Sequence, residues 1–169
     1  MRQFARRTLL LLAGAVIFWY GMEFLHESGH MFAALLTGGK IEHLGFPLLG
    51  FSCTEISPNP HPALVAWAGP VFGGVIPLLA YLAFRLARLN SYFLHLFAAF
   101  CLLANGAYLG IGSFDRIGDA GDILRRGCPI QWLWMFGVVA GAIGIGLLKA
   151  LQLPPVRPKT SSAASESDR

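Results

Sequence analysis

The stretch from Thr8 to Thr37 is almost wholly apolar, and it restricts the fold more than any other part of the chain. As a helix it would be about 45 Å long at 1.5 Å per residue, which exceeds the roughly 30 Å hydrocarbon layer of a bilayer. Within this stretch stand His26, Glu27 and His30. Ionisable groups at membrane depth are costly, so they indicate a functional site in a membrane helix.

The motif His26-Glu27-Ser28-Gly29-His30 is typical of metal-binding helices. Its two imidazoles are four residues apart, so they project from one helix face and can share a tetrahedral zinc ion, while Glu27 can act on a water molecule there. Glu23 extends the polar stripe by one turn, as a group that orients a ligand or lies near a wet cavity. The alternative is that these side chains are buried polar groups that hydrogen-bond to neighbouring helices.

The composition predicts an integral membrane protein, because hydrophobic residues make up 55% of the 169 residues, charged residues 13%, and the mean hydropathy is +0.58. We expect an all-α polytopic membrane protein, with one membrane-embedded domain over residues 1–153 and a polar, disordered tail over residues 154–169. Four membrane spans are predicted, at residues 8–37, 63–84, 91–112 and 130–148. The net charge of +4 comes mostly from residues that flank these spans, which indicates contact with the lipid bilayer and no nucleic-acid partner.

The segment from Lys40 to Pro62 differs from the spans, because strand-forming and turn-forming residues alternate in it. It is too apolar for a free loop and too broken for a helix. A short β-like hairpin at the membrane interface fits this composition, since irregular backbone is tolerated where protein or water covers it. Its free edge could pair with an extended peptide. The alternative is a plain connecting loop.

The basic residues predict how the chain is oriented in the membrane. With four spans, the N-terminus, the turn at residues 85–90 and the tail share one side. Of the 13 Lys and Arg residues, only four lie on the other side, namely Lys40, Arg116, Arg125 and Arg126. The positive-inside rule therefore predicts that both termini lie in the cytoplasm. The membrane is expected to be a plasma (inner) membrane. The first span is expected to remain uncleaved, because a signal-peptide cut near residue 15 would leave too short an apolar core.

Two histidines leave a catalytic zinc ion short of one protein ligand, because such sites usually have three protein ligands and a water molecule. The carboxylates that lie beyond the first helix and its loop, and before the tail, are those of Asp115, Asp119 and Asp122. All three follow the third predicted span. One of them is expected to be the third ligand.

The order of these motifs resembles the site-2 protease family of intramembrane zinc metallopeptidases. The resemblance covers roughly residues 19–134, and it depends on His26 to His30, Ala68-Gly69-Pro70, Asn105 and Gly118-Asp119-Ala120-Gly121. The chain is most similar to a small branch of the family without regulatory domains. In that branch an Asp-Ala-Gly motif is followed by Gly-x-Pro and then Trp, which matches the sequence after position 119 here.

The resemblance implies that His26, His30 and Asp119 hold a Zn²⁺ ion, with Asp122 as the alternative third ligand. It implies that Glu27 is the catalytic base. The implied activity is that of a zinc metalloendopeptidase, which hydrolyses a peptide bond in or near a transmembrane segment of a membrane-protein substrate. Larger members of the family carry Asn-x-x-Pro in the third span, and this chain lacks that proline.

Two other functions are compatible with the polar stripe. A catalytically inactive zinc-binding or helix-packing scaffold would have the same helices, but the chain keeps both histidines and Glu27 together. A small transporter or channel subunit could use the stripe as an ion path, but the sequence has no obvious internal repeat. No motif specifies the substrate or the oligomeric state.

Overall fold

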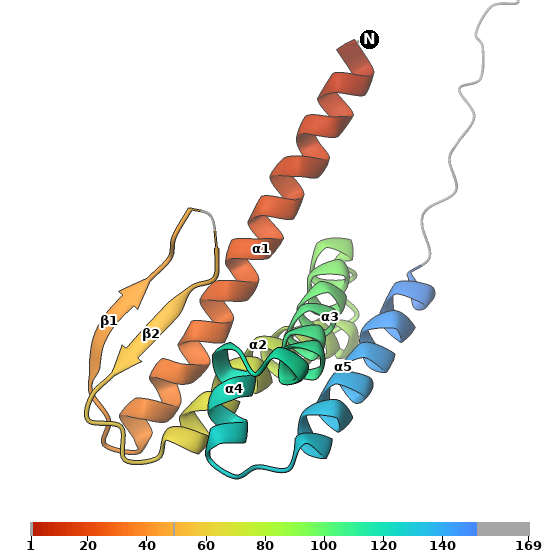
Figure 1. Ribbon diagram of the computed structural model, residues 1–169. Helices are drawn as coiled ribbons and strands as arrows, with labels where there is room; N and C mark the ends of the chain where they lie inside the picture. The colour runs from red at the N-terminus through yellow and green to blue at the C-terminus, as the bar shows by residue number, and fades with distance from the viewer. Residues whose placement is uncertain (1, 49, 152–169) are drawn as a thin grey trace, which may run out of the picture.

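The computed structural model describes residues 2–48 and 50–151, and Figure 1 shows how they are arranged. These residues form five helices and one two-stranded sheet. In chain order the elements are α1 (Arg2–Leu36), β1 (Ile41–Gly45), β2 (Cys53–Ile56), α2 (Pro62–Leu86), α3 (Tyr92–Asp115), α4 (Gly118–Arg125) and α5 (Ile130–Ala150). The predicted all-α polytopic fold with a short hairpin after the first helix is confirmed. The tail predicted for residues 154–169 lies outside the described residues.

Four of the helices, α1, α2, α3 and α5, are long and apolar enough to cross a membrane, so the chain is a multi-pass membrane protein. They correspond to the four predicted spans, with ends that differ by a few residues. The largest difference is in α1, which begins at Arg2 and not at residue 8. Arginine and glutamine are good helix formers, so this helix extends beyond its apolar part.

The long helices pack in the spatial order α1, α2, α3, α5 (Figure 1). Small residues allow α3 and α5 to approach closely: a Cβ atom added to Gly137 would lie 2.9 Å from the carbonyl oxygen of Gly106. Such contacts hold membrane helices together, because lipid supplies no hydrophobic force between them. The N-terminal half of α1 extends beyond the other helices and exposes Leu9 to Leu12.

The hairpin is antiparallel and lies beside the C-terminal half of α1 (Figure 1). Its register pairs Ile41 with Ile56 and Gly45 with Cys53, with an irregularity between the first two pairs. The Tyr20 hydroxyl donates a hydrogen bond of 2.8 Å to the carbonyl oxygen of Leu48 near the tip. The hairpin is therefore attached to α1 at both its base and its tip.

The connection after the third span differs from the prediction, because it contains a helix. The third span was expected to end at residue 112, yet α3 continues to Asp115 and stops at Arg116, whose φ of 54° is left-handed. The short helix α4 follows and buries Ala120 and Ile123 against Leu109 of α3. Two buried side chains over eight residues are too few to give a helical period in a sequence.

Candidate metal centre

His26 and His30 lie on one face of α1, and each ring is held through its Nδ1 atom. The Nδ1 of His26 is 2.8 Å from Oδ1 of Asn105 on α3, and the Nδ1 of His30 is 2.8 Å from the carbonyl oxygen of Val65 on α2. Both partners are acceptors. Asn105 uses its own amide Nδ2 to donate to the Cys101 carbonyl oxygen, which turns its Oδ1 toward the histidine. Each Nδ1 therefore carries a proton, which leaves Nε2 as the nitrogen of each ring that can bind a metal ion.

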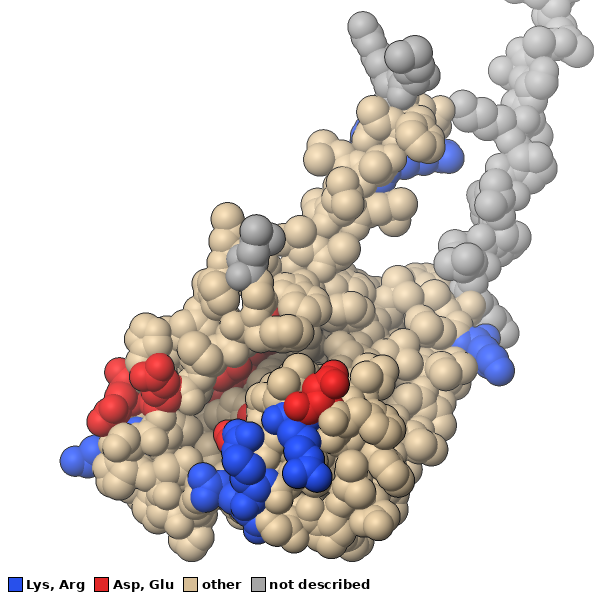
Figure 2. Space-filling model, in the orientation of Figure 1, with Lys and Arg blue, Asp and Glu red and all other residues tan. Residues whose placement is uncertain are grey.

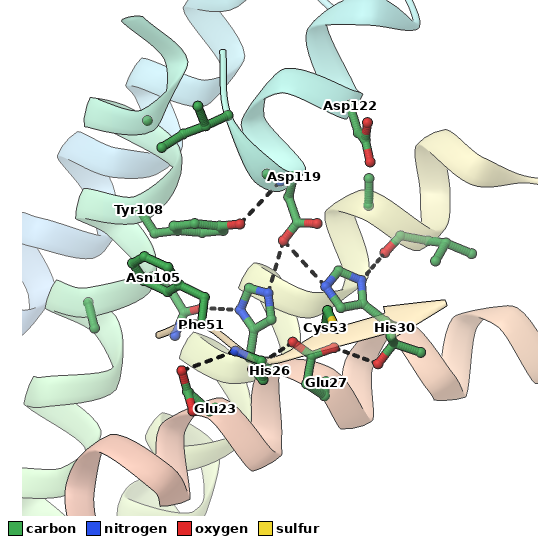
Figure 3. A pocket seen from close by; sticks show the side chains of 18 of the residues that line it. Glu23, His26, Glu27, His30, Phe51, Cys53, Asn105, Tyr108, Asp119 and Asp122 are labelled. Carbon is green, nitrogen blue, oxygen red and sulfur yellow. Dashed lines mark hydrogen bonds and ion pairs between the residues drawn. The ribbon is translucent and has the colours of Figure 1, made fainter. Parts of the chain in front are cut away.

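The two Nε2 atoms converge on one carboxylate oxygen, Oδ2 of Asp119 (Figure 3). This oxygen is 2.9 Å from the Nε2 of His26 and 3.3 Å from the Nε2 of His30. The backbone N–H of Asp119 donates to the Tyr108 hydroxyl, which fixes the start of α4 above the histidines. Burial raises the pKa of the Asp119 carboxyl, but the hydrogen bonds and charges of the two histidines outweigh burial and lower the pKa to about 2. The group is therefore a carboxylate, which is its metal-binding form.

The other two acids of this region lie farther from the histidines. Asp122 lies apart from the point of convergence in Figure 3, and its carboxylate forms an ion pair with Arg125. Asp115 is exposed at the end of α3. Of the three acids that the sequence offered as a third ligand, the structure brings only Asp119 together with the histidine pair.

The three atoms suit a zinc ion in both chemistry and spacing. Two imidazole nitrogens and one carboxylate oxygen are a ligand set found in catalytic zinc sites, which leave the fourth position to water or substrate. Ligand atoms at about 2.0–2.2 Å from a tetrahedral ion lie about 3.3–3.6 Å from one another. The two distances to Asp119 Oδ2 come within a few tenths of an ångström of that spacing.

Glu27 lies beside the histidine pair and is held by the hairpin. Its carboxylate has an oxygen within 4.8 Å of a ring nitrogen of each histidine, a distance that one water molecule can bridge. The Ser52 hydroxyl donates to Oε1 over 2.7 Å, and the Thr54 hydroxyl donates to Oε2 over 2.5 Å. A carboxylate has about four lone-pair positions, so two accepted hydrogen bonds leave capacity to accept a proton from water.

Glycine is required where α1 and α2 meet behind the centre. A Cβ atom added to Gly69 would overlap the His30 ring and would lie 2.8 Å from the Nε2 of His26. A Cβ atom added to Gly29 would overlap the backbone of α2 at Ala68. The glycines of the two sequence motifs therefore let the helix backbones approach closely enough for Val65 to hold His30.

A cavity of about 730 Å³ gives access to these groups. Its walls come from α1, the hairpin, α2, α3 and α4, and it is lined by His26, Glu27, His30, Asp119 and Asp122 among others. Figure 2 shows this face hollowed, with acidic atoms inside the hollow. A volume of this size accommodates several side chains of an extended peptide.

Several residues of the site had no role in the sequence prediction. Asn105 was noticed only as part of a family resemblance, although an amide in an apolar span is itself a signal. Tyr108 stands at the position of the missing proline in Asn-x-x-Pro, and no role was assigned to it from the sequence. The carbonyl oxygen of Val65 carries no sequence signal, because every residue has one. The hydroxyls of Ser52 and Thr54 could not be assigned before the position of the hairpin was known.

Comparison of the chain with models of protein families, with curated proteins and with solved structures finds no match. What the centre can do is therefore argued from its geometry and its chemistry.

Proposed function

We propose that this protein is an intramembrane zinc metalloendopeptidase, which hydrolyses a peptide bond in or near a transmembrane segment of a membrane-protein substrate. The observation that carries the proposal is the convergence of two histidine Nε2 atoms on Asp119 Oδ2, with Glu27 beside them, inside a bundle of membrane-spanning helices. The proposal agrees with the resemblance to the small branch of the site-2 protease family.

In this proposal His26, His30 and Asp119 hold the zinc ion. The ion would supply Lewis-acid chemistry, lowering the pKa of a water molecule and polarising the scissile carbonyl. Asn105 and Val65 act behind the ligands, since a hydrogen bond at Nδ1 fixes the ring and raises the basicity of the opposite nitrogen.

Glu27 is proposed to move the proton. It takes a proton from the attacking water and passes it to the nitrogen of the leaving amine, so the carboxylate is regenerated at the end of the cycle. Ser52 and Thr54 hold both of its oxygens, so the hairpin fixes the carboxylate at the edge of the cavity. This arrangement favours hydrolysis over a purely structural metal site, because a structural site has four protein ligands and needs no adjacent base.

The substrate is proposed to enter the cavity as an extended chain. A transmembrane helix has all its backbone groups hydrogen-bonded, so it must unwind locally before a peptide bond can be cut. The hairpin beside the cavity could hold the unwound segment by strand pairing. We further propose a plasma (inner) membrane location with both termini in the cytoplasm, which the distribution of lysine and arginine supports.

The experiment that tests the proposal combines metal analysis with a cleavage assay. Protein purified in detergent without chelators should contain about one zinc ion per chain by elemental analysis, and in liposomes it should cleave members of a panel of tagged single-span membrane proteins. Glu27→Gln should keep the zinc and lose cleavage, because the base is removed but no ligand is.

Three outcomes would count against the proposal. A zinc content near zero in the purified protein would show that His26, His30 and Asp119 do not hold a zinc ion. Cleavage by the Glu27→Gln protein at the rate of the unaltered protein would show that Glu27 is not the catalytic base. A full zinc content with no cleavage of any panel member beyond the Glu27→Gln background would favour the alternative, a catalytically inactive zinc-binding scaffold.

A further inference from the structure

Glu23 is a buried carboxylate with an unused oxygen, and the proposed reaction gives it no role. It lies on α1 one helical turn before Glu27, and only 2% of its surface is exposed. Its Oε1 accepts a hydrogen bond of 3.3 Å from the backbone N–H of Ser52, but among the described residues its Oε2 accepts no hydrogen bond of normal geometry, although the Trp19 side chain lies next to the carboxyl group. A buried carboxylate oxygen without a donor is costly, so a donor group brought to this point would be bound favourably.

The part of the cavity around Glu23 has aromatic walls. Trp19, one turn earlier on α1, has its ring centroid 5.9 Å from that of Phe51, and the Phe51 ring lies 5.9 Å from the ring of Tyr108. All three residues and Glu23 line the same cavity. Aromatic faces attract cations through their quadrupole, and aliphatic stems pack well against them.

The charges along the cavity favour a cationic occupant. Its lining includes five carboxylates and one arginine, namely Glu23, Glu27, Asp115, Asp119, Asp122 and Arg126, and a second arginine, Arg125, pairs with Asp122. A divalent ion at the histidines would reduce this excess of negative charge without reversing it. Figure 2 shows acidic atoms within the hollow. A concave site lined by charge of one sign concentrates ligands of the opposite sign.

We propose that Glu23, with the walls formed by Trp19 and Phe51, is a subsite for a lysine or arginine side chain of the substrate. This inference rests on the proposed function and specifies the substrate class. Along the helix, Glu23 lies about one turn, or about 5.4 Å, before His26 and Glu27, and an extended chain advances about 3.3 Å per residue. The basic residue therefore lies within about two positions of the scissile bond.

Two other occupants fit the site less well. A second zinc ion needs about three protein ligands, and Glu23 contributes one free oxygen here. A backbone N–H of the substrate could donate to Oε2, but it would leave the aromatic walls and the excess negative charge unexplained. A cationic side chain uses all three features.

The test is a binding measurement that needs no turnover. Full-length zinc-loaded protein carrying Glu27→Gln is titrated in detergent micelles with two fluorescent nine-residue apolar peptides, which differ only in a central lysine or norleucine. The lysine peptide should bind about tenfold more tightly, a difference typical of one partly desolvated charge pair. Adding Glu23→Gln should bring the ratio of the two dissociation constants close to one, while the norleucine peptide binds as before.

A matched control is Glu55→Gln, which removes an exposed carboxylate of β2 that does not line the cavity. This control should leave the ratio unchanged. Equal binding of the two peptides before Glu23 is altered, or a ratio that persists in the Glu23→Gln protein, would overturn the subsite. A loss of zinc from the Glu23→Gln protein would assign Glu23 to the metal centre, and this result would also overturn the proposed subsite. Because binding is measured without cleavage, a failure of the subsite and a failure of the peptidase function give different results.

Discussion

The histidine nitrogens that face Asp119 are selected by atoms far away in the sequence. Asn105 lies 79 residues after His26, and the Val65 carbonyl lies 35 residues after His30. Both bind Nδ1, so both rings present Nε2 to the same point. The ligand geometry is therefore a property of α2 and α3 as much as of the helix that carries the histidines.

At this scale the first prediction concerns the third ligand. Asp119→Asn should weaken zinc binding by more than about 100-fold, because even changes behind a ligand cost about 10- to 100-fold. Asp122→Asn is the matched control, since its carboxylate pairs with exposed Arg125 and should affect zinc little. Competition with a zinc-sensitive dye measures both affinities. If Asp122→Asn loses the metal while Asp119→Asn keeps it, the roles of the two acids must be exchanged.

A second prediction concerns the base. Thr54→Val keeps the shape of the side chain but removes the hydroxyl that donates to Glu27 Oε2. Cleavage should slow by about 10- to 100-fold, because a hydrogen bond to a charged group contributes about 1.5–3 kcal/mol. Zinc content should not change, and Thr54→Ser should restore most of the rate. An unaltered rate in Thr54→Val would show that the hairpin does not position the base.

The sequence predicted the residues of the centre whose chemistry is unusual for a membrane span. Spacing alone put His26 and His30 on one face, and the family resemblance favoured Asp119 over its neighbours. The supporting atoms could not be predicted in the same way. A backbone carbonyl or a common hydroxyl becomes part of a site only through tertiary packing, and no local pattern distinguishes it.

At the scale of elements, the contact between α1 and α2 determines whether the histidines can meet Asp119. Gly69 lies where the rings of His26 and His30 pack against α2. A side chain at this position would occupy the space of the rings, so only glycine fits. The hairpin approaches the same centre from the other direction and holds Glu27. Each element thus contributes through its position, while α1 supplies most of the reactive groups.

Gly69→Ala tests this contact. The added methyl group should displace both rings, weakening zinc binding at least tenfold and destabilising the protein by about 1–3 kcal/mol, the usual cost of overpacking. Gly74→Ala on the same helix is the control, because its Cβ atom would lie 3.5 Å from Leu102, an ordinary contact. Zinc titration and thermal unfolding distinguish the two variants. Full zinc affinity in the Gly69→Ala protein would contradict this prediction, because it would show that α1 and α2 can move apart without displacing the histidines.

The elements themselves were predicted to different degrees. The four spans follow from long apolar runs, which have few alternatives in a chain of this composition. The hairpin was predicted from the turn and strand residues between Lys40 and Pro62. Helix α4 was missed, because it is short and its burial depends on α2, α3 and α5.

For the whole molecule, if all four candidate helices cross the membrane, the start of α1, the turn between α2 and α3, and the end of α5 lie on one side of it. Reporters fused after Arg169 and within residues 87–91 should both indicate the cytoplasm, because this side carries most of the lysine and arginine. A reporter inserted within residues 126–129, between α4 and α5, should indicate the opposite side. An exported signal from either of the first two fusions would contradict the proposed orientation.

Metal removal should also be visible in the stability of the whole molecule. A metal ion present at a free concentration 100 times its dissociation constant raises the free energy of unfolding by about 2.7 kcal/mol. A chelator should therefore lower the melting temperature by about 5–10 °C. Scanning fluorimetry in detergent measures the change. Asp119→Asn protein should melt at the same temperature with and without chelator, and an equal shift in that variant would point to a metal bound elsewhere.

The distance in sequence between His26 and Asp119 has a consequence for biosynthesis. The two residues are 93 positions apart, so α1 leaves the ribosome long before α4 exists. At roughly 5–20 residues per second, about 5–20 s pass between the synthesis of the histidines and that of Asp119. During that time the nascent chain has two of the three proposed ligands, and the candidate metal centre becomes complete only after α1, the hairpin, α2 and α3 have been made. A ribosome that stalls before Asp119 therefore leaves a fragment without the proposed third ligand, and zinc binding at this centre can serve as a readout of synthesis through α4.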